Sequence, residues 1–137
     1  MSLEILAYET TSLGILCLRR RELLSNPGTI VTEVTLNHEF LMSSYLNESE
    51  RALARIGLEK VSTSNPNDLK ILVGGLGLGY TANECLASEQ VTSVEVVEFL
   101  PQVISWLEQK LIPLAGPLSA DSRLHITEGD IYSRVTS

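Results

Sequence analysis

The strongest chemical signal in this sequence is a run rich in glycine. The run GGLGLG, residues 74–79, follows a short apolar stretch typical of a buried strand and precedes a helical pattern. A glycine-rich turn between strand and helix lets the backbone approach a ligand closely, and free N–H groups there favour an anion or a carboxylate. A merely tight connection is the alternative, but four glycines in six residues cost backbone entropy that such a turn does not need. We therefore predict that Gly75, Gly77 and Gly79 cradle a ligand.

Two acidic residues lie at the ends of later strands. Glu98 ends the second predicted strand, about twenty residues beyond the glycines, where a carboxylate can accept hydrogen bonds from both ribose hydroxyls of an adenosine. A lone Glu at a strand end is otherwise often solvated, and the glycine run upstream favours the binding role. Asp130 follows the third predicted strand and could accept from an adenine amino group. It could equally act as a turn residue or helix N-cap before Ile131, and the two roles are compatible.

Alternating strands and helices position these residues. Strands are predicted at 69–73, 91–98 and 123–127, with helices at 80–88 and from Pro101 onward. This alternation predicts a parallel, doubly wound sheet, which binds ligands at the carboxyl ends of its strands.

The first part of the chain has a different pattern. β-Branched residues alternate with a period of two, which predicts antiparallel strands near 3–10, 15–21 and 29–36. Gly14 and the cluster Asn26, Pro27, Gly28 separate these strands. The sequence therefore begins with a small β-meander.

A helix and a linker connect the two patterns. The period changes from Leu41, and Asn47 with Glu50 three residues later forms a capping-box pattern for a helix that we expect to stop at Gly57. Residues 62–68 form a polar, turn-rich linker. We predict an α/β chain with a small N-terminal antiparallel β-module (1–40), a connecting helix and linker (41–68) and a partial Rossmann-like, doubly wound parallel sheet (69–137).

Composition restricts the kinds of partner. The 137 residues include 17 Asp and Glu against 10 Lys and Arg, which gives a net charge of −7. This balance argues against nucleic acid or an anionic membrane as a partner and suits a cationic small substrate.

The sequence has no stretch long enough to span a membrane and no signal-peptide pattern at its start, so we expect a cytoplasmic location. Cys17 and Cys85 lie in apolar runs and are expected to be reduced core residues.

Other polar and aromatic residues are expected to be structural. The side chains of Arg19, Arg20 and Arg21 alternate between the faces of a strand, which favours a solvated sheet edge. Trp106 has apolar neighbours on its helix and is expected in the core. The two histidines, His38 and His125, are isolated from each other and from the cysteines, so we predict no metal site.

In this order of elements the sequence resembles the spermidine synthase-like proteins of the class I S-adenosylmethionine-dependent methyltransferase superfamily. Behind the β-module, the resemblance is carried by HEFLMSSYLNESE (38–50), LKILVGGLGLGYTA (69–82), VEVVEFLPQVISWL (94–107) and RLHITEGD (123–130). Glu39 and Phe40 match a Glu-Phe pair of the family. The resemblance implies that the glycine loop lies under a sulfonium nucleoside, S-adenosylmethionine or its decarboxylated form, while Glu98 holds the ribose and Asp130 contacts the adenine. It also implies a polyamine as acceptor.

The sequence departs from the family at three places. Gly77 stands where the family usually carries an Asp thought to hold the aminopropyl amine, so selectivity for the decarboxylated donor is not implied. Glu33 stands in place of an expected Gln. The family's polyamine-binding and proton-accepting Asp residues follow a fourth strand, beyond Ser137. We therefore expect the isolated 137-residue chain to be inactive and assign no catalytic residue.

Two other functions fit parts of the sequence. Gly77, Gly79 and Ala82 form G-x-G-x-x-A, which together with Glu98 is also the fingerprint of an NAD-binding oxidoreductase domain. The β-module and the Gly-Asp pair after the third strand favour the transferase family. A non-catalytic binding or assembly module is the third possibility. Because a sheet of three strands leaves an edge open, we expect a homodimer.

Overall fold

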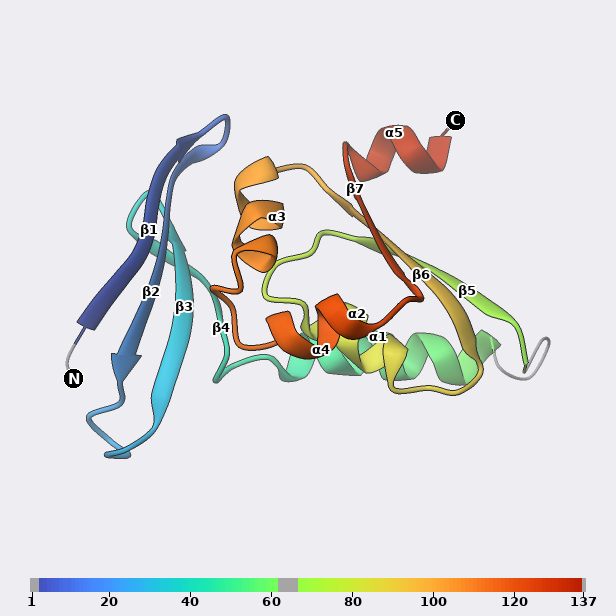
Figure 1. Cartoon of the computed structure of the whole chain (residues 1–137), viewed down its shortest axis with the longest axis horizontal. Helices are drawn as coiled ribbons and strands as arrows, with labels where there is room; N and C mark the ends of the chain where they lie inside the picture. The colour runs from blue at the N-terminus through green and yellow to red at the C-terminus, as the bar shows by residue number, and fades with distance from the viewer. Residues whose placement is uncertain (1–2, 62–66, 137) are drawn as a thin grey trace.

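The computed structural model describes residues 3–61 and 67–136, which form two sheets with helices between them (Figure 1). The first sheet is antiparallel in the order β1 (Leu3–Thr11), β2 (Gly14–Glu22), β3 (Ile30–Leu36) and β4 (Glu39–Ser43). The second is parallel in the order β5 (Leu69–Gly74), β6 (Val91–Glu98) and β7 (Leu124–Glu128). The predicted α/β fold class, an antiparallel module followed by a parallel sheet interleaved with helices, is confirmed.

The first sheet contains one strand more than the sequence predicted. Strand β4 occupies the segment where a change to helical period was expected from Leu41. It is joined to β3 by Asn37 and His38, whose φ angles of 51° and 70° lie in the left-handed region that two-residue hairpin turns require. Asn and His tolerate this region better than most residues, but without a glycine the turn gives only a weak sequence signal.

Helix α1 (Glu48–Val61) begins directly after Asn47, as the capping-box pattern predicted. Its predicted end at Gly57 is wrong, because the helix continues for one more turn. Leu58 in that turn packs against the core, and such packing outweighs the cost of a helical glycine, about 1 kcal/mol. Most of the predicted linker, 62–66, lies outside the described residues.

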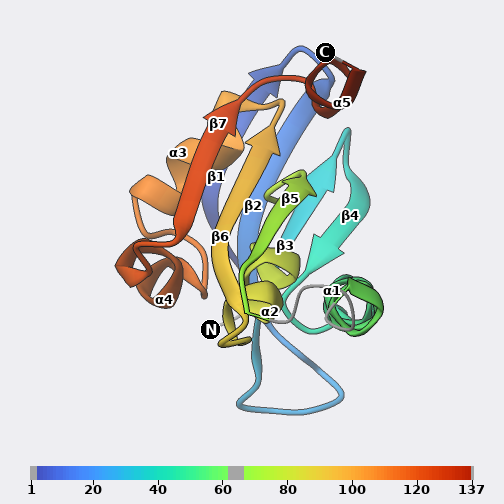
Figure 2. The ribbon, with the colours of Figure 1, turned by 90° about the vertical axis from the view of Figure 1, so that its right-hand side faces the viewer.

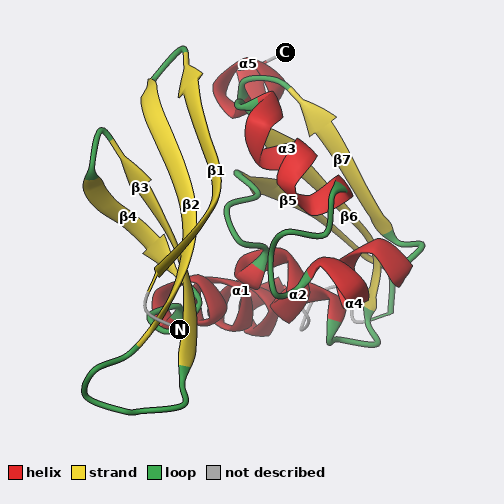
Figure 3. Ribbon diagram, turned by 60° about the vertical axis from the view of Figure 1, so that its left-hand side comes forward, coloured by secondary structure: helices red, strands yellow, loops and turns green. Residues whose placement is uncertain are grey.

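Four further helices in the described residues connect or follow the strands of the second sheet: α2 (Tyr80–Leu86), α3 (Pro101–Glu108), α4 (Ala115–Ala120) and α5 (Ile131–Thr136). Helices α2, α3 and α4 lie on the side of this sheet that faces the first sheet, and α5 follows the end of β7 (Figures 2 and 3). The arrangement gathers the carboxyl ends of β5, β6 and β7 at one edge.

A single core joins the two sheets. Leu16, Leu18 and Val34 of the first sheet belong to the same buried cluster as Val96 of β6 and Trp106 of α3. The Trp106 side chain is 1% exposed, which confirms its predicted core position, and its indole N–H donates to Glu9 Oε2 of β1 at 2.8 Å. The first sheet is therefore fixed to the second by packing and by a partly buried polar contact.

The cysteines are placed as predicted, since Cys17 and Cys85 are both buried and unpaired. Within residues 3–61 and 67–136, no helix has the length and apolar character needed to span a membrane.

The arginine run of β2 differs from the prediction of a solvated edge. Strand β2 pairs with β1 on one side and β3 on the other, so it is not an edge strand. Arg19 and Arg21 share one face, and their Nε atoms donate to Glu33 Oε1 at 2.9 and 2.8 Å. Burial alone would raise the pKa of Glu33, but hydrogen bonds from Arg21 and Arg19 outweigh it and lower the pKa below its usual value.

Candidate functional site

The glycine loop connects β5 to α2 through three left-handed residues. Gly75, Gly77 and Gly79 have φ angles of 97°, 54° and 90°, a region that L side chains enter only with strain. A Cβ atom at Gly79 would overlap the Leu118 side chain of α4, and one at Gly77 would lie 3.1 Å from Met42 Sδ. At Gly75 a Cβ would meet nothing within 4 Å. Close packing accounts for part of the glycine content, while Gly75 leaves its side of the loop open.

Glu98 holds this loop in place. Its side chain is buried, and Oε1 accepts a hydrogen bond from the Leu76 N–H at 2.7 Å. Oε2 accepts from the Leu100 N–H at 3.0 Å. Because a carboxylate offers about four acceptor sites, Glu98 retains acceptor capacity beyond these two bonds. Glu98 therefore lies beside the glycine loop, and its predicted contact with a ribose stays a prediction. The sequence did not predict that Glu98 supports the loop.

A cavity of about 380 Å³ lies against the loop. This volume is within the range of small-molecule sites. Side chains from β4, α1, the loop, α2 and β6 line it together with the loop backbone: Met42, Ser43, Glu50, Leu53, Leu76, Leu78, Tyr80, Thr81 and Glu98. The cavity therefore lies between the antiparallel module and the parallel sheet, with α1 forming one wall.

The cavity is acidic. Glu50 and Glu98 line it, and no Lys, Arg or His is among its lining residues in the described part of the chain. The Glu50 carboxylate makes no hydrogen bond or ion pair with any residue that the structure describes, whereas the Glu50 carbonyl accepts from Thr81 Oγ1 at 3.2 Å.

Burial raises the pKa of Tyr80, an effect that the charge of Arg51 opposes, so the phenol stays protonated and can donate at neutral pH.

Sequence reasoning missed Glu50 as a site residue, although it noticed Glu50 as part of a capping pattern. Only the fold brings the first turn of α1 beside a loop that starts more than twenty residues later in the sequence. Tyr80 and Thr81 had a usable signal, since both follow the glycine run directly.

Asp130 lies at the same carboxyl edge but is not among the residues lining the cavity. Its Oδ1 accepts from the Tyr132 N–H at 3.0 Å at the start of α5, which is the capping role that the sequence left open. The preceding Gly129 N–H donates to the Glu98 carbonyl at 2.9 Å, so the turn that carries Asp130 is attached to the end of β6. A contact between Asp130 and an adenine stays a prediction.

The other acids and the histidines do not join the cavity. Glu33 is held by its arginines on β3, and Glu39 is exposed on β4. Within the described residues, no three His, Cys, Asp or Glu side chains come together as a metal site would require.

Comparison with solved structures identifies the fold. The structure matches the crystal structure of spermidine synthase from Thermotoga maritima with a TM-score of 0.74, over 96% of this chain at 17% identity. The chain has the fold of spermidine synthase. A second match, with the same TM-score, identity and coverage, is a spermidine synthase in complex with the transition state analogue AdoDATO.

The chain spans 42% of the length of these spermidine synthase chains. No protein-family model and no curated protein sequence matches it. The spermidine synthase likeness thus concerns the fold, and the predicted ligand rests on the residues of this chain.

Proposed function

We propose that this chain is a spermidine synthase-like domain that binds a sulfonium nucleoside, S-adenosylmethionine or its decarboxylated form, in the glycine-loop cavity. The observation that carries the proposal is the acidic cavity itself, in which Glu98 supports a loop of left-handed glycines and the Glu50 carboxylate has no partner among the described residues. Gly75, Gly77 and Gly79 would lie along the nucleoside, and Glu98 would accept from its ribose.

The charge of the cavity supports a cationic ligand. Both donors carry a sulfonium and an ammonium group, and S-adenosylmethionine also carries a carboxylate that its decarboxylated form lacks. Two lining carboxylates, with no Lys, Arg or His among the described lining residues, attract the two positive charges. The solved spermidine synthase with AdoDATO adds support, since that protein holds a transition state analogue on the same fold.

The transfer that a complete site of this kind would perform needs few protein groups. The nitrogen of an acceptor amine attacks a carbon bonded to the sulfonium, and the C–S bond breaks with its electron pair left on a now neutral sulfur. The amine loses a proton. Aminopropyl transfer releases methylthioadenosine and methyl transfer releases S-adenosylhomocysteine. Positioning accounts for most of the catalysis, and a polyamine acceptor suits a chain with net charge −7.

An NAD-binding oxidoreductase domain is the competing function. It would use Gly77, Gly79 and Ala82 with Glu98, as the sequence allows. A dinucleotide, however, brings a pyrophosphate with two negative charges to the loop, where the lining residues within 3–61 and 67–136 offer two carboxylates and no side-chain cation. The cavity therefore favours the sulfonium nucleoside.

Calorimetric titration of the chain with four ligands tests the proposal. We expect S-adenosylmethionine, its decarboxylated form and methylthioadenosine each to bind at least tenfold more tightly than NAD. Tighter binding of NAD would favour the oxidoreductase domain, and binding of none of the four would favour a non-catalytic module.

A further inference from the structure

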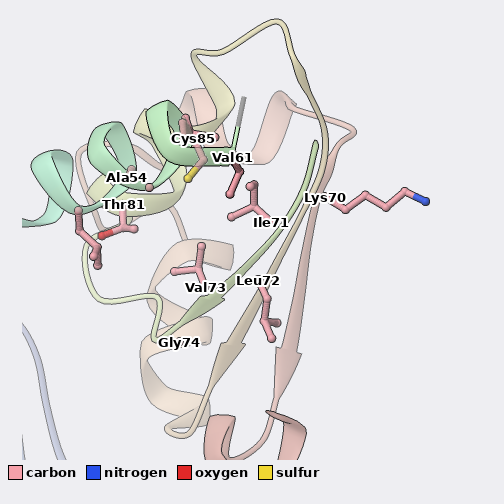
Figure 4. A pocket seen from close by; sticks show the side chains of 12 residues that line it. Ala54, Val61, Lys70, Ile71, Leu72, Val73, Gly74, Thr81 and Cys85 are labelled. Atoms are coloured by element: carbon pink, nitrogen blue, oxygen red, sulfur yellow. The ribbon is translucent and has the colours of Figure 1, made fainter. Parts of the chain in front are cut away.

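An apolar cavity between β5 and α1 gives no indication of what covers it. Its volume is about 380 Å³. Lys70 is its one charged lining residue in the described part of the chain, and Figure 4 shows Lys70 pointing away from the helix, while Ile71 and Val73 point toward it. No charge therefore selects an occupant for this cavity. The uncovered face of the first sheet does carry charges.

That face lies opposite the core. Leu16, Leu18 and Val34 point inward, so the residues that alternate with them on β2 and β3 point to the other side of the sheet, its outer face. In Figure 1 every labelled helix lies on one side of the first sheet. Within residues 3–61 and 67–136, the outer face is thus left without a covering element.

The strand register arranges the outer face in rows that run from β1 to β4. Arg19 and Glu33 are neighbours in the middle row. Tyr8 of β1 and Phe40 of β4 lie at the two ends of the row on one side of it. The middle row is charged, and the ends of its neighbour are aromatic.

The row on the other side of the middle one begins at Leu3 of β1 and passes through Val31. Tyr45, which follows β4, lies beside Val31. Leu3 and Tyr45, like Tyr8 and Phe40, are each more than half exposed. An apolar and aromatic rim around arginines is typical of the core of a protein interface.

The charges at the centre are only partly matched within the chain. The Glu33 side chain is 4% exposed, and its Oε1 accepts from the Nε of Arg19 at 2.9 Å and of Arg21 at 2.8 Å. The terminal nitrogens of Arg19 make no hydrogen bond with any residue that the structure describes. A guanidinium offers five donors, so Arg19 retains donors for a second carboxylate.

We propose that two copies of this chain associate through the outer faces of their antiparallel sheets, about a two-fold axis that runs parallel to the strands between β2 and β3. This axis keeps each row at its own height and exchanges β1 with β4 and β2 with β3. Tyr8 of one copy then lies opposite Phe40 of the second, and Leu3 opposite Tyr45. The strands of the two sheets stay nearly aligned, as face-to-face sheets prefer.

The same axis places Arg19 of one copy opposite Glu33 of the second, and the reverse. Both carboxylates gain a donor, and the free terminal nitrogens of Arg19 gain an acceptor. A two-fold axis that crosses the middle row at right angles to the strands would instead place Arg19 against Arg19 and Glu33 against Glu33. Like charges in contact are costly, so the charge pattern selects the axis along the strands.

The distribution of charge also favours this face over others. The chain carries −7 in all, whereas Arg19, Arg21 and Glu33 give the outer face +2 − 1 = +1. The rest of the chain therefore carries −7 − 1 = −8, and two copies approaching through it would repel each other. The sequence placed a homodimer at the open edge of the parallel sheet, and the outer face is a different surface.

Sedimentation velocity over a hundredfold range of chain concentration tests the association, and we expect an equilibrium between monomer and dimer. Phe40→Thr should raise the dimer dissociation constant at least tenfold, because the two-fold axis makes each lost aromatic contact count twice. Threonine suits an exposed strand position, so the circular dichroism should not change. Tyr132→Thr, which removes an exposed ring from α5, is the matched control and should change the constant less than twofold.

Paramagnetic broadening in mixed samples tests the axis. Isotope-labelled parent chain is mixed with unlabelled Leu3→Cys that carries a nitroxide, and the label reacts at the new thiol because Cys17 and Cys85 are buried. We expect the Tyr45 amide resonance of the parent to broaden at least threefold more than that of Leu3. A nitroxide on Tyr132→Cys should broaden neither.

Three results would overturn the proposal. A chain that stays monomeric at every concentration would leave the outer face to another protein. Equal weakening by Phe40→Thr and Tyr132→Thr would place the contact elsewhere. Broadening of Leu3 in place of Tyr45 would mean that β1 faces β1, which the axis along the strands does not allow.

Discussion

The carboxylate of Glu98 at the end of β6 accepts a hydrogen bond from the backbone N–H of Leu76, 22 residues earlier, at 2.7 Å. Its other oxygen accepts from Leu100 at the entrance to α3. One buried side chain therefore fixes the glycine loop to the neighbouring strand. It also places a carboxylate on the wall of the cavity.

The first prediction concerns this residue. Glu98→Ala should weaken binding of methylthioadenosine and S-adenosylmethionine by about 1–3 kcal/mol, because the ribose hydroxyls lose their acceptor and the Leu76 N–H loses its partner. Calorimetry measures the change. Glu95→Ala, on the same strand but outside the cavity lining, is the matched control and should bind as the parent does. An unchanged affinity in folded Glu98→Ala would remove Glu98 from the site.

The second prediction separates charge from shape in the cavity. Glu50→Gln should weaken binding of S-adenosylmethionine and its decarboxylated form about fivefold to tenfold, since one charge-assisted contact is lost. Binding of methylthioadenosine, which has neither a sulfonium nor an ammonium group, should change less than about twofold on the same grounds. Glu48→Gln, in the same helical turn but paired with Arg51 and Arg55, serves as the control. Equal losses for all three ligands would show that Glu50 does not recognise a cation.

The third prediction distinguishes a ligand cradle from a tight turn. Gly75→Ala should cost about 1–2 kcal/mol of unfolding free energy from its left-handed φ and should also weaken nucleoside binding, since the new methyl group enters open space beside the loop. Gly79→Ala should destabilise more, because its Cβ overlaps Leu118. Urea unfolding and calorimetry on both variants test this. Full affinity in folded Gly75→Ala would favour the structural turn.

The fourth prediction follows from the lowered pKa of Glu33. Above the carboxyl's unfolded pKa, near 4.5, the ion pairs with Arg19 and Arg21 stabilise the fold, and this contribution is lost as pH falls through the lower folded pKa. Glu33→Gln should cost about 1–3 kcal/mol at pH 7, a figure reduced for the partial exposure of both arginines. The cost should shrink below about pH 4. Glu4→Gln, in an exposed pair with Arg20, should cost less than about 0.5 kcal/mol. Urea unfolding at several pH values measures both.

The order of elements in the parallel sheet was predictable because its signals are local. Apolar runs, the glycine loop and the Pro at the start of α3 each lie within a few residues of the element that they mark. The acidic ends of β6 and β7 followed from the same reasoning, since strand ends in a parallel sheet share an edge.

The remaining features depend on contacts between distant segments. The β4 hairpin turn uses Asn37 and His38 without a glycine, and α1 passes Gly57 because Leu58 packs into the core. Glu33 pairs with arginines 12 and 14 residues away, and the local pattern at 19–21 carries no signal of this pairing, so it predicts a solvated edge. Glu50 joins the cavity only through the packing of α1 against α2.

The last prediction concerns turnover. The 137-residue chain should bind the donor without transferring an aminopropyl or methyl group at a measurable rate, since transfer needs an acceptor amine that is both aimed and deprotonated. Of the cavity's acids, Glu98 accepts from two backbone N–H groups and, in the proposed complex, from the ribose, and Glu50 cannot hold the donor's ammonium group and also take the acceptor's proton.

Incubation with labelled donor and putrescine or spermidine, followed by chromatography for methylthioadenosine and S-adenosylhomocysteine, measures the rate. Two variants locate the base if steady release is found. Loss of that release in Glu50→Gln would make Glu50 the proton acceptor and contradict its role in holding the donor. Loss in Glu33→Gln, with binding intact, would mean that a carboxylate paired with two arginines still reaches the acceptor. The ion pairs of Glu33 with Arg19 at 2.9 Å and Arg21 at 2.8 Å oppose this.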